Sequence, residues 1–122
     1  MSVCLIVDDD RLSCDIFVKI LEPLQIRIVV KTDSVEALEF CANKMPDIML
    51  LDLKMPKMDG FTFIKILRKM VGGQLVKIIA CTGLSDAETL GKLKENGING
   101  YLVKPFTAEL LREKVNHFMS VF

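Results

Sequence analysis

The feature that most constrains the fold is a regular alternation of short apolar runs and longer segments with helical periodicity. The apolar runs are rich in Val, Ile and Leu and lie at residues 3–7, 26–30, 48–51, 77–81 and 101–103. Several are apolar throughout, as in parallel strands covered on both faces. The helical segments follow at 10–24, 34–43, 61–70, 86–96 and 107–119. Because crossovers between parallel strands are right-handed, this order predicts one parallel sheet with helices on both faces.

Local signals mark where the predicted helices begin and end. Asp33 and Ser85 each precede a glutamate by three residues, which is the spacing of a capping box. Thr107 is the expected N-cap of the last helix. Pro23 should end the first helix, and the pair at 96–97, Asn-Gly, is a standard stop for the fourth.

Length and composition point to one ordinary globular domain, which we expect to span residues 1–122. Hydrophobic residues make up 51% and the formal net charge is zero, so the balance of charge does not favour direct binding of nucleic acid or a membrane surface. No apolar run approaches the roughly 18–20 residues of a membrane span. The start of the chain lacks the basic and apolar regions of a signal peptide, and we expect none.

The cysteine pattern favours reduced thiols rather than a metal site or a disulfide framework. Cys4, Cys14, Cys41 and Cys81 are widely spaced and form no C-x-x-C pair, and the chain has a single histidine, His117. Reduced, mostly buried thiols are typical of cytosolic proteins. We therefore expect a cytoplasmic location.

Four of the five apolar runs are followed by a polar group suited to phosphate or metal chemistry, and the second is followed by what looks like a helix cap at 31–33. The first run ends in three aspartates at 8–10, the third in Asp52, the fourth in Thr82 and the fifth in Lys104. Each alone has an ordinary interpretation as a helix cap, a loop hydroxyl or a turn, although a carboxylate after apolar residues 48–51 is costly unless it is partnered. Ligands of such sheets bind at the carboxyl ends of the strands, so the combination predicts a site there.

The chemistry of that edge would be dominated by carboxylates. If the first and third strands are neighbours, Asp8, Asp9 and Asp52 lie together, and two like charges 4 Å apart repel by about 4 kcal/mol at an effective dielectric constant near 20. Such a cluster takes up a proton or recruits a cation. Oxygen ligands at a small open site favour Mg²⁺, and Lys104 would add a fixed positive charge. A carboxylate in this setting can attack phosphorus and form an acyl phosphate.

These motifs resemble the receiver domain of bacterial-type two-component response regulators. VDDD after the first run, LLDLKMPKMDG at the third, CTG at the fourth and GYLVKPF at the fifth occur in the family's order and spacing, over essentially the whole chain. Residues 100–106 look especially like the single-domain chemotaxis receivers. The expected fold is α/β: a five-stranded parallel sheet in a doubly wound, flavodoxin-like (βα)5 sandwich with strand order 2-1-3-4-5.

The resemblance implies a metal site and a phosphoacceptor. Asp52 matches the phosphoacceptor and belongs to the metal site. Asp9 matches the direct Mg²⁺ ligand, and Asp8 matches the residue that holds a metal-bound water. The backbone carbonyl of Lys54 would complete the protein's share of the metal shell. The sharp Met-Pro and Asp-Gly turn after Asp52 would then return this carbonyl toward the metal.

The resemblance also implies contacts to the phosphoryl group and a switch. Thr82 and Lys104 would each bind a phosphoryl oxygen, and the Lys104–Pro105 peptide bond is expected to be cis. Tyr101 matches the switch aromatic, which fills the space that Thr82 leaves when Thr82 moves toward the phosphoryl group.

The implied function is a phosphorylation-activated signalling switch. The donor would be a sensor histidine kinase or a histidine phosphotransfer protein, and small donors such as acetyl phosphate should also serve. The chain would catalyse its own phosphorylation without being a turnover enzyme. The surface formed by residues 86–96, 101–103 and 107–119 would change and engage a downstream target or output domain. The cognate kinase, the oligomeric state (monomer or phosphorylation-dependent dimer) and whether the chain is stand-alone or part of a longer regulator or hybrid kinase stay open.

Other classes of protein fit the sequence less well. A haloacid-dehalogenase-type phosphatase would place a D-x-D nucleophile after the first strand, whereas here the candidate follows the third. A flavodoxin would have a Ser/Thr-rich phosphate loop where this chain has aspartates, and no G-x-x-x-x-G-K pattern is present. The remaining alternative is a pseudo-receiver, a protein-interaction module of the same fold that is not phosphorylated.

Two further hypotheses concern single residues. Gly91 lies within the fourth predicted helix, where glycine costs about 0.5–1 kcal/mol relative to alanine. It either eases movement of this helix or permits close packing of a neighbour. Lys54 and Leu84 lie two residues after Asp52 and Thr82, positions that influence phosphoryl hydrolysis in this family. An apolar Leu84 predicts slow self-dephosphorylation.

Overall fold

The computed structural model describes residues 2–83 and 87–119, in which strands and helices alternate as predicted. The elements are, in order, β1 (Val3–Val7), α1 (Arg11–Leu21), η1 (Glu22–Leu24), β2 (Arg27–Lys31), α2 (Ser34–Asn43), β3 (Ile48–Asp52), α3 (Gly60–Lys69), η2 (Gly73–Leu75), β4 (Lys77–Thr82), α4 (Ala87–Glu95), β5 (Gly100–Val103) and α5 (Ala108–Met119). The elements η1 and η2 are short 3-10 turns.

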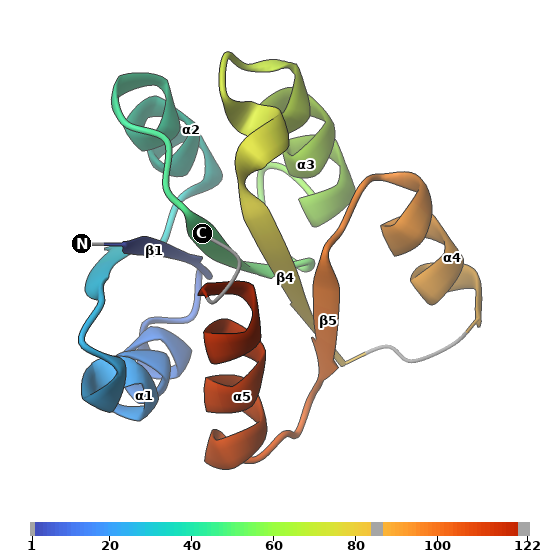
Figure 1. Ribbon diagram of the computed structural model, residues 1–122. Coiled ribbons are helices and arrows are strands. Elements are labelled where there is room, and N and C mark those ends of the chain that lie inside the picture. Colours follow the sequence, from blue (N-terminus) through green and yellow to red (C-terminus); the bar gives the residue numbers. More distant parts are fainter. Residues whose placement is uncertain (1, 84–86, 120–122) are drawn as a thin grey trace.

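The strands form one parallel sheet in the order β2-β1-β3-β4-β5 (Figure 1). This confirms the doubly wound fold and the predicted strand order. The central strands β1 and β3 are almost wholly buried, whereas the edge strand β2 is only partly covered. The order reverses between β1 and β3, so the chain leaves the sheet in opposite directions there and opens a crevice at their carboxyl ends.

Two hydrophobic layers cover the sheet. Helices α1 and α5 lie on one face and α2, α3 and α4 on the other (Figure 1). The α1–α5 layer is packed around Phe17, Leu21, Leu111 and Val115. Alternate residues of β1 and β3 point into each layer, which explains why these strands are apolar throughout.

The predicted helix ends are largely confirmed by their hydrogen bonds. The backbone N–H of Val35 donates to Asp33 Oδ1 at 3.1 Å, and that of Leu110 donates to Thr107 Oγ1 at 3.1 Å. Helix α4 ends at Glu95, and Gly97 follows with a positive φ of 76°. The other predicted N-cap, Ser85, lies outside the described residues, as does Leu84, the residue of the hydrolysis hypothesis.

Several boundaries differ by one to three residues from the predictions. The first helix was expected to run to residue 24, but α1 ends at Leu21 and the 3-10 turn η1, which contains Pro23, continues it. The reason is that proline lacks the N–H that a further α-helical turn needs. Strand β2 runs from 27 to 31 rather than from 26 to 30, in register with β1.

The four cysteines are buried and free, as expected. Burial raises the pKa of Cys4 and Cys81 to about 12 and that of Cys14 and Cys41 to about 11, so the thiols stay protonated at neutral pH. Among the described residues, no helix has the length and apolar character needed to cross a membrane.

Candidate functional site

The sheet brings the predicted site residues to one edge. Asp8 follows β1, Asp52 ends β3, Thr82 ends β4, and Lys104 follows β5. The strands are parallel and in close register: Val7 lies beside Leu51, and residue 82 lies beside residue 103. Side chains that are 22 to 96 residues apart along the chain are therefore brought to the same edge of the sheet.

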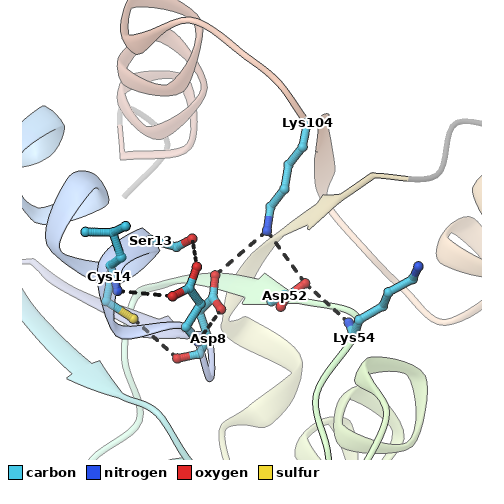
Figure 2. Close-up of polar contacts among 8 residues, drawn as sticks. Asp8, Ser13, Cys14, Asp52, Lys54 and Lys104 are labelled. Atoms are coloured by element: carbon cyan, nitrogen blue, oxygen red, sulfur yellow. Dashed lines mark hydrogen bonds and ion pairs between the residues drawn. The ribbon is translucent and has the colours of Figure 1, made fainter.

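Three carboxylates form the centre of this edge. One oxygen each from Asp8, Asp9 and Asp52 lie within 4.8 Å of one another, with Asp8 buried, Asp52 partly buried and Asp9 exposed. The Nζ atom of Lys104 lies 3.9 Å from Asp8 Oδ2 and 3.8 Å from Asp52 Oδ1 (Figure 2). Among the described residues, Lys104 thus lies against two of the three carboxylates, those of Asp8 and Asp52.

Asp8 is the carboxylate of this group whose charge is least well compensated. The residue is only 1% exposed. Its Oδ1 atom accepts a hydrogen bond from the backbone N–H of Asp10 at 2.9 Å, but Oδ2 has no hydrogen-bond donor within the described part of the chain. Burial raises the pKa of Asp8 to about 6; the charges of Asp52 and Asp9 add to the rise, whereas the Asp10 N–H and Lys104 oppose it. A cation near Oδ2 would satisfy this oxygen and offset the repulsion.

Asp10 has a different role from its two neighbours. It is the N-cap of α1: Oδ1 accepts from the backbone N–H of Leu12 at 3.2 Å, and Oδ2 accepts from the hydroxyl of Ser13 at 2.8 Å. The ordinary interpretation of an acidic helix cap is therefore correct for Asp10. For Asp8 it fails, because Asp8 points toward Asp52 and Lys104 (Figure 2).

The loop after β3 folds back tightly, as its sequence predicts. The backbone N–H of Lys54 donates to Asp52 Oδ1 at 3.3 Å, and that of Gly60 donates to the carbonyl of Leu53 at 2.9 Å. A Cβ atom on Gly60 would lie 2.7 Å from Leu53 Cα, so the closure requires glycine. In Figure 2 the side chain of Lys54 extends away from Asp52. The loop thus brings the backbone of Lys54, and not its amine, toward the carboxylates.

The two predicted switch residues lie on the neighbouring strands β4 and β5 and differ in exposure. Thr82 is buried, and its carbonyl accepts a hydrogen bond from the backbone N–H of Lys104 at 2.7 Å. Tyr101 is 38% exposed, and Lys114 Nζ lies 6.0 Å from the centroid of its ring. The Lys104–Pro105 peptide bond is cis, as expected.

Two features near the site were absent from the sequence interpretation. An ion pair joins Lys57 in the loop after β3 to Asp33, with Nζ 3.3 Å from Oδ2. An apolar groove of about 330 Å³ also adjoins Lys104, and its other lining residues are Ser13, Ile16, Phe17, Ile20, Pro105 and Phe106. Both features depend on side chains from distant segments. The amphipathic pattern of α1 gave no sign that Phe106 stacks on Phe17, their ring centroids 5.9 Å apart.

Comparisons with known proteins agree with this geometry. A family model described as response regulator receiver domain matches residues 4–116. The sensor histidine kinase CheAY of Helicobacter pylori is 35% identical over 98% of this chain and 15% of its own length. The probable C4-dicarboxylate response regulator DctR of Halalkalibacterium halodurans is 34% identical over 97% of this chain and 51% of its own length. The chain therefore spans about half the length of one of these relatives and much less of the other.

A solved structure shows the same fold at nearly full coverage of both chains. The chemotaxis response regulator CheY4 of Vibrio cholerae superposes with a TM-score of 0.90 at 28% identity, over 97% of this chain and 98% of that one.

Proposed function

This chain belongs to the response regulator receiver domain family, and from that membership we propose that it is a switch that accepts a phosphoryl group on Asp52. The single observation that best supports the proposal is the meeting of Asp8, Asp9, Asp52 and Lys104 at the edge where the family resemblance places the phosphoacceptor. Receiver domains are signalling switches rather than turnover enzymes.

Phosphoryl transfer needs a nucleophile, a balance of charge and a leaving group. A carboxylate oxygen of Asp52 attacks the phosphorus of a phosphohistidine, the P–N bond breaks, and its electron pair returns to the imidazole, which takes up a proton as histidine leaves. The product is an aspartyl phosphate. The ammonium group of Lys104, 3.8 Å from Asp52 Oδ1, is placed to bind a phosphoryl oxygen, and the hydroxyl of Thr82 is proposed to bind another.

The carboxylates fit a magnesium ion. Asp9 would be a direct ligand, Asp8 would hold a metal-bound water, and Asp52 and the carbonyl of Lys54 would complete the protein's share. Oxygen-only donors and the unsatisfied Oδ2 atom of Asp8 support this assignment. When bound, Mg²⁺ supplies positive charge against the phosphoryl oxygens.

Switching would couple the site to the α4–β5–α5 surface. The phosphoryl group on Asp52 would carry a charge of about −1.5 to −2, in place of the single negative charge of the carboxylate, and would bring several acceptor oxygens. We propose that Thr82 moves toward it and that Tyr101, which is now partly exposed, turns inward to fill the space. The population of the active surface then rises, and a downstream target or output domain binds it.

The donor would be a histidine kinase or a histidine phosphotransfer protein. Its phosphohistidine must reach Asp52 beside Lys104, where the apolar groove of α1 opens. Leu12 and Ile16 of α1 extend this apolar surface and are 68% and 52% exposed. We propose that the donor covers these side chains. The buried thiols support a cytoplasmic location.

The proposal is tested by intact mass after incubation with acetyl phosphate. The wild type should gain one phosphoryl group in the presence of Mg²⁺ and none with EDTA, and Asp52→Asn should gain none in either condition. Mass gain in Asp52→Asn would contradict the assignment of the phosphoacceptor. Failure of the wild type with both acetyl phosphate and a phosphorylated histidine phosphotransfer domain would instead favour the pseudo-receiver, a pure interaction module.

A further inference from the structure

We propose that Lys57 is a positioning residue, whose ion pair with Asp33 holds the loop after β3 in its metal-binding conformation. This inference rests on the proposed Mg²⁺ site, because that loop contains Lys54. Among the described residues, the Lys57 side chain pairs with Asp33, and not with the proposed metal ligands or the phosphoacceptor.

The loop after β3, residues 53–59, is closed by a backbone hydrogen bond where its two ends meet, and its middle is attached to the start of α2 by an exposed ion pair. At the base, the Gly60 N–H donates to Leu53 and leaves no space for a side chain. Toward the tip, a pocket of about 120 Å³ separates the loop from the start of α2; it is lined by Thr32, Asp33, Ser34, Met55, Pro56 and Lys57. The ion pair between Lys57 and Asp33 lies across this gap.

Both partners of the ion pair are held in place. Asp33 is the N-cap of α2, and its Oδ1 accepts the Val35 N–H while Oδ2 faces Lys57 Nζ at 3.3 Å. Lys57 has a positive φ of 28°, a region where glycine is more usual. The chain therefore places a long cationic side chain at a backbone position that disfavours one. The ion pair with Asp33 offsets part of this conformational cost.

The consequence for metal binding is a shift in population. If the free loop samples conformations in which the Lys54 carbonyl faces away, the apparent dissociation constant for Mg²⁺ rises as the competent fraction falls. Exposed ion pairs are weak, and Lys57 is mostly exposed, so we expect loss of the pair to weaken Mg²⁺ binding by about two- to fivefold.

Simple charge attraction makes the opposite prediction for one variant. Lys57→Gln removes a positive charge near an acidic site, which by itself strengthens the attraction for Mg²⁺. If the ion pair holds the loop in place, Lys57→Gln should instead bind Mg²⁺ more weakly. The sign of the change in affinity therefore separates positioning from long-range electrostatics.

The test is a calorimetric titration of the whole chain with Mg²⁺. Lys57→Gln and Asp33→Asn should each weaken binding by about two- to fivefold, and the double variant should be no weaker than either. Asparagine keeps the N-cap of α2, so Asp33→Asn removes the charge while sparing the helix. Lys57→Arg should restore wild-type affinity, and Lys19→Gln on α1 controls for general loss of charge.

Two further readouts separate positioning from general damage. In Lys57→Gln, hydrogen exchange of residues 53–59 should quicken without Mg²⁺ while the helices stay protected. The Mg²⁺ concentration for half-maximal phosphorylation should rise while the rate at saturating Mg²⁺ stays unchanged. Equal or tighter Mg²⁺ binding by Lys57→Gln would overturn the inference and leave the proposed function standing. A wild type that binds no Mg²⁺ would overturn both.

Discussion

The two ends of the sheet each carry charged side chains that are at least partly buried, but they stabilise these charges in different ways. At the amino end, Arg68 in the last turn of α3 donates to the carbonyls of Gly73, Val76 and Gly97 at 2.6–2.8 Å and to Asn99 Oδ1 at 3.1 Å. At the carboxyl end, Asp8 and Asp52 share Lys104 at 3.8–3.9 Å, and the carboxylate of Asp9 lies beside them. At the amino end, backbone carbonyls accept the hydrogen bonds of the guanidinium group. At the carboxyl end, Asp8 Oδ2 has no hydrogen-bond donor among the described residues.

The difference shows which end is built for a ligand. Arg68 joins the α3–β4 loop to the α4–β5 loop, and Asn99 Oδ1 also accepts the N–H of Ile78 at 2.8 Å. At the other end, Asp8 Oδ2 has no donor in the described structure and the pKa of Asp8 is raised. An internally satisfied network stabilises the fold, whereas an unsatisfied one lowers stability until a cation binds.

The largest effect on stability should follow from removing the hydrogen bonds of Arg68 at the amino end of the sheet. Arg68→Met keeps the aliphatic stem and removes the donors from four acceptors, so we expect a loss of about 2–4 kcal/mol in the free energy of unfolding. Urea denaturation measures it. Because the carboxyl end is untouched, Mg²⁺ affinity should not change. A loss below about 1 kcal/mol would mean that water replaces the guanidinium at little cost.

Removing the charge of Asp8 at the carboxyl end should instead stabilise the protein. A carboxyl group whose pKa is raised from 3.8 to about 6 contributes stability below pH 3.8, and this stability is lost as the pH rises through 6. Asp8→Asn removes the charge, so without Mg²⁺ it should stabilise the protein by about 2–3 kcal/mol at pH 7.5 and by little at pH 4.

Denaturation with EDTA at the two pH values tests this prediction. Asp15→Asn, on the exposed side of α1, serves as a control for loss of one negative charge. Equal stabilisation by Asp8→Asn at both pH values would show that titration of Asp8 is not the cause.

The smallest effect concerns α4, which runs between the two ends. Its carboxyl end is attached to Arg68 through the carbonyl of Gly97, and a Cβ on Gly91 would meet no described atom within 4 Å. The close-packing alternative for Gly91 is therefore wrong. Gly91→Ala should stabilise the protein by about 0.5–1 kcal/mol and slow hydrogen exchange in α4.

The same variant tests whether Gly91 eases switching. Exchange in α4 would be compared with and without beryllofluoride, a phosphoryl mimic, in wild type and Gly91→Ala. Unchanged protection and an unchanged response to the mimic would end the hypothesis. As a matched contrast, Gly73→Ala should destabilise, because its Cβ would clash with the carbonyl of Leu67.

The sequence was sufficient for the fold and for the edge of the sheet that holds the site. The alternation of continuously apolar runs and helical segments predicts a parallel sheet with helices on both faces, and parallel strands bring Asp8, Asp52 and Lys104 to one edge. The strand order 2-1-3-4-5 came from the family resemblance. The switch pair Thr82 and Tyr101 was placed by resemblance alone, and the structure adds that one is buried and the other partly exposed.

What the sequence did not predict are contacts between loops. Lys57 meets Asp33 across 24 residues, and Arg68 reaches Asn99 across 31. Neither pair has a spacing that local rules recognise, because long charged side chains adopt many rotamers and find partners only after the sheet has formed. Arg68 was unremarkable in sequence, as one of several basic residues on α3.

The most direct test of the contrast between the two ends is a Mg²⁺ titration by calorimetry at pH 7.5. We expect one site per chain in the wild type, about tenfold or greater weakening of Mg²⁺ binding in Asp9→Asn, and wild-type affinity in Arg68→Met. Absence of binding by the wild type, or equal affinity in Asp9→Asn, would contradict the claim that the carboxyl end of the sheet is completed by a metal ion.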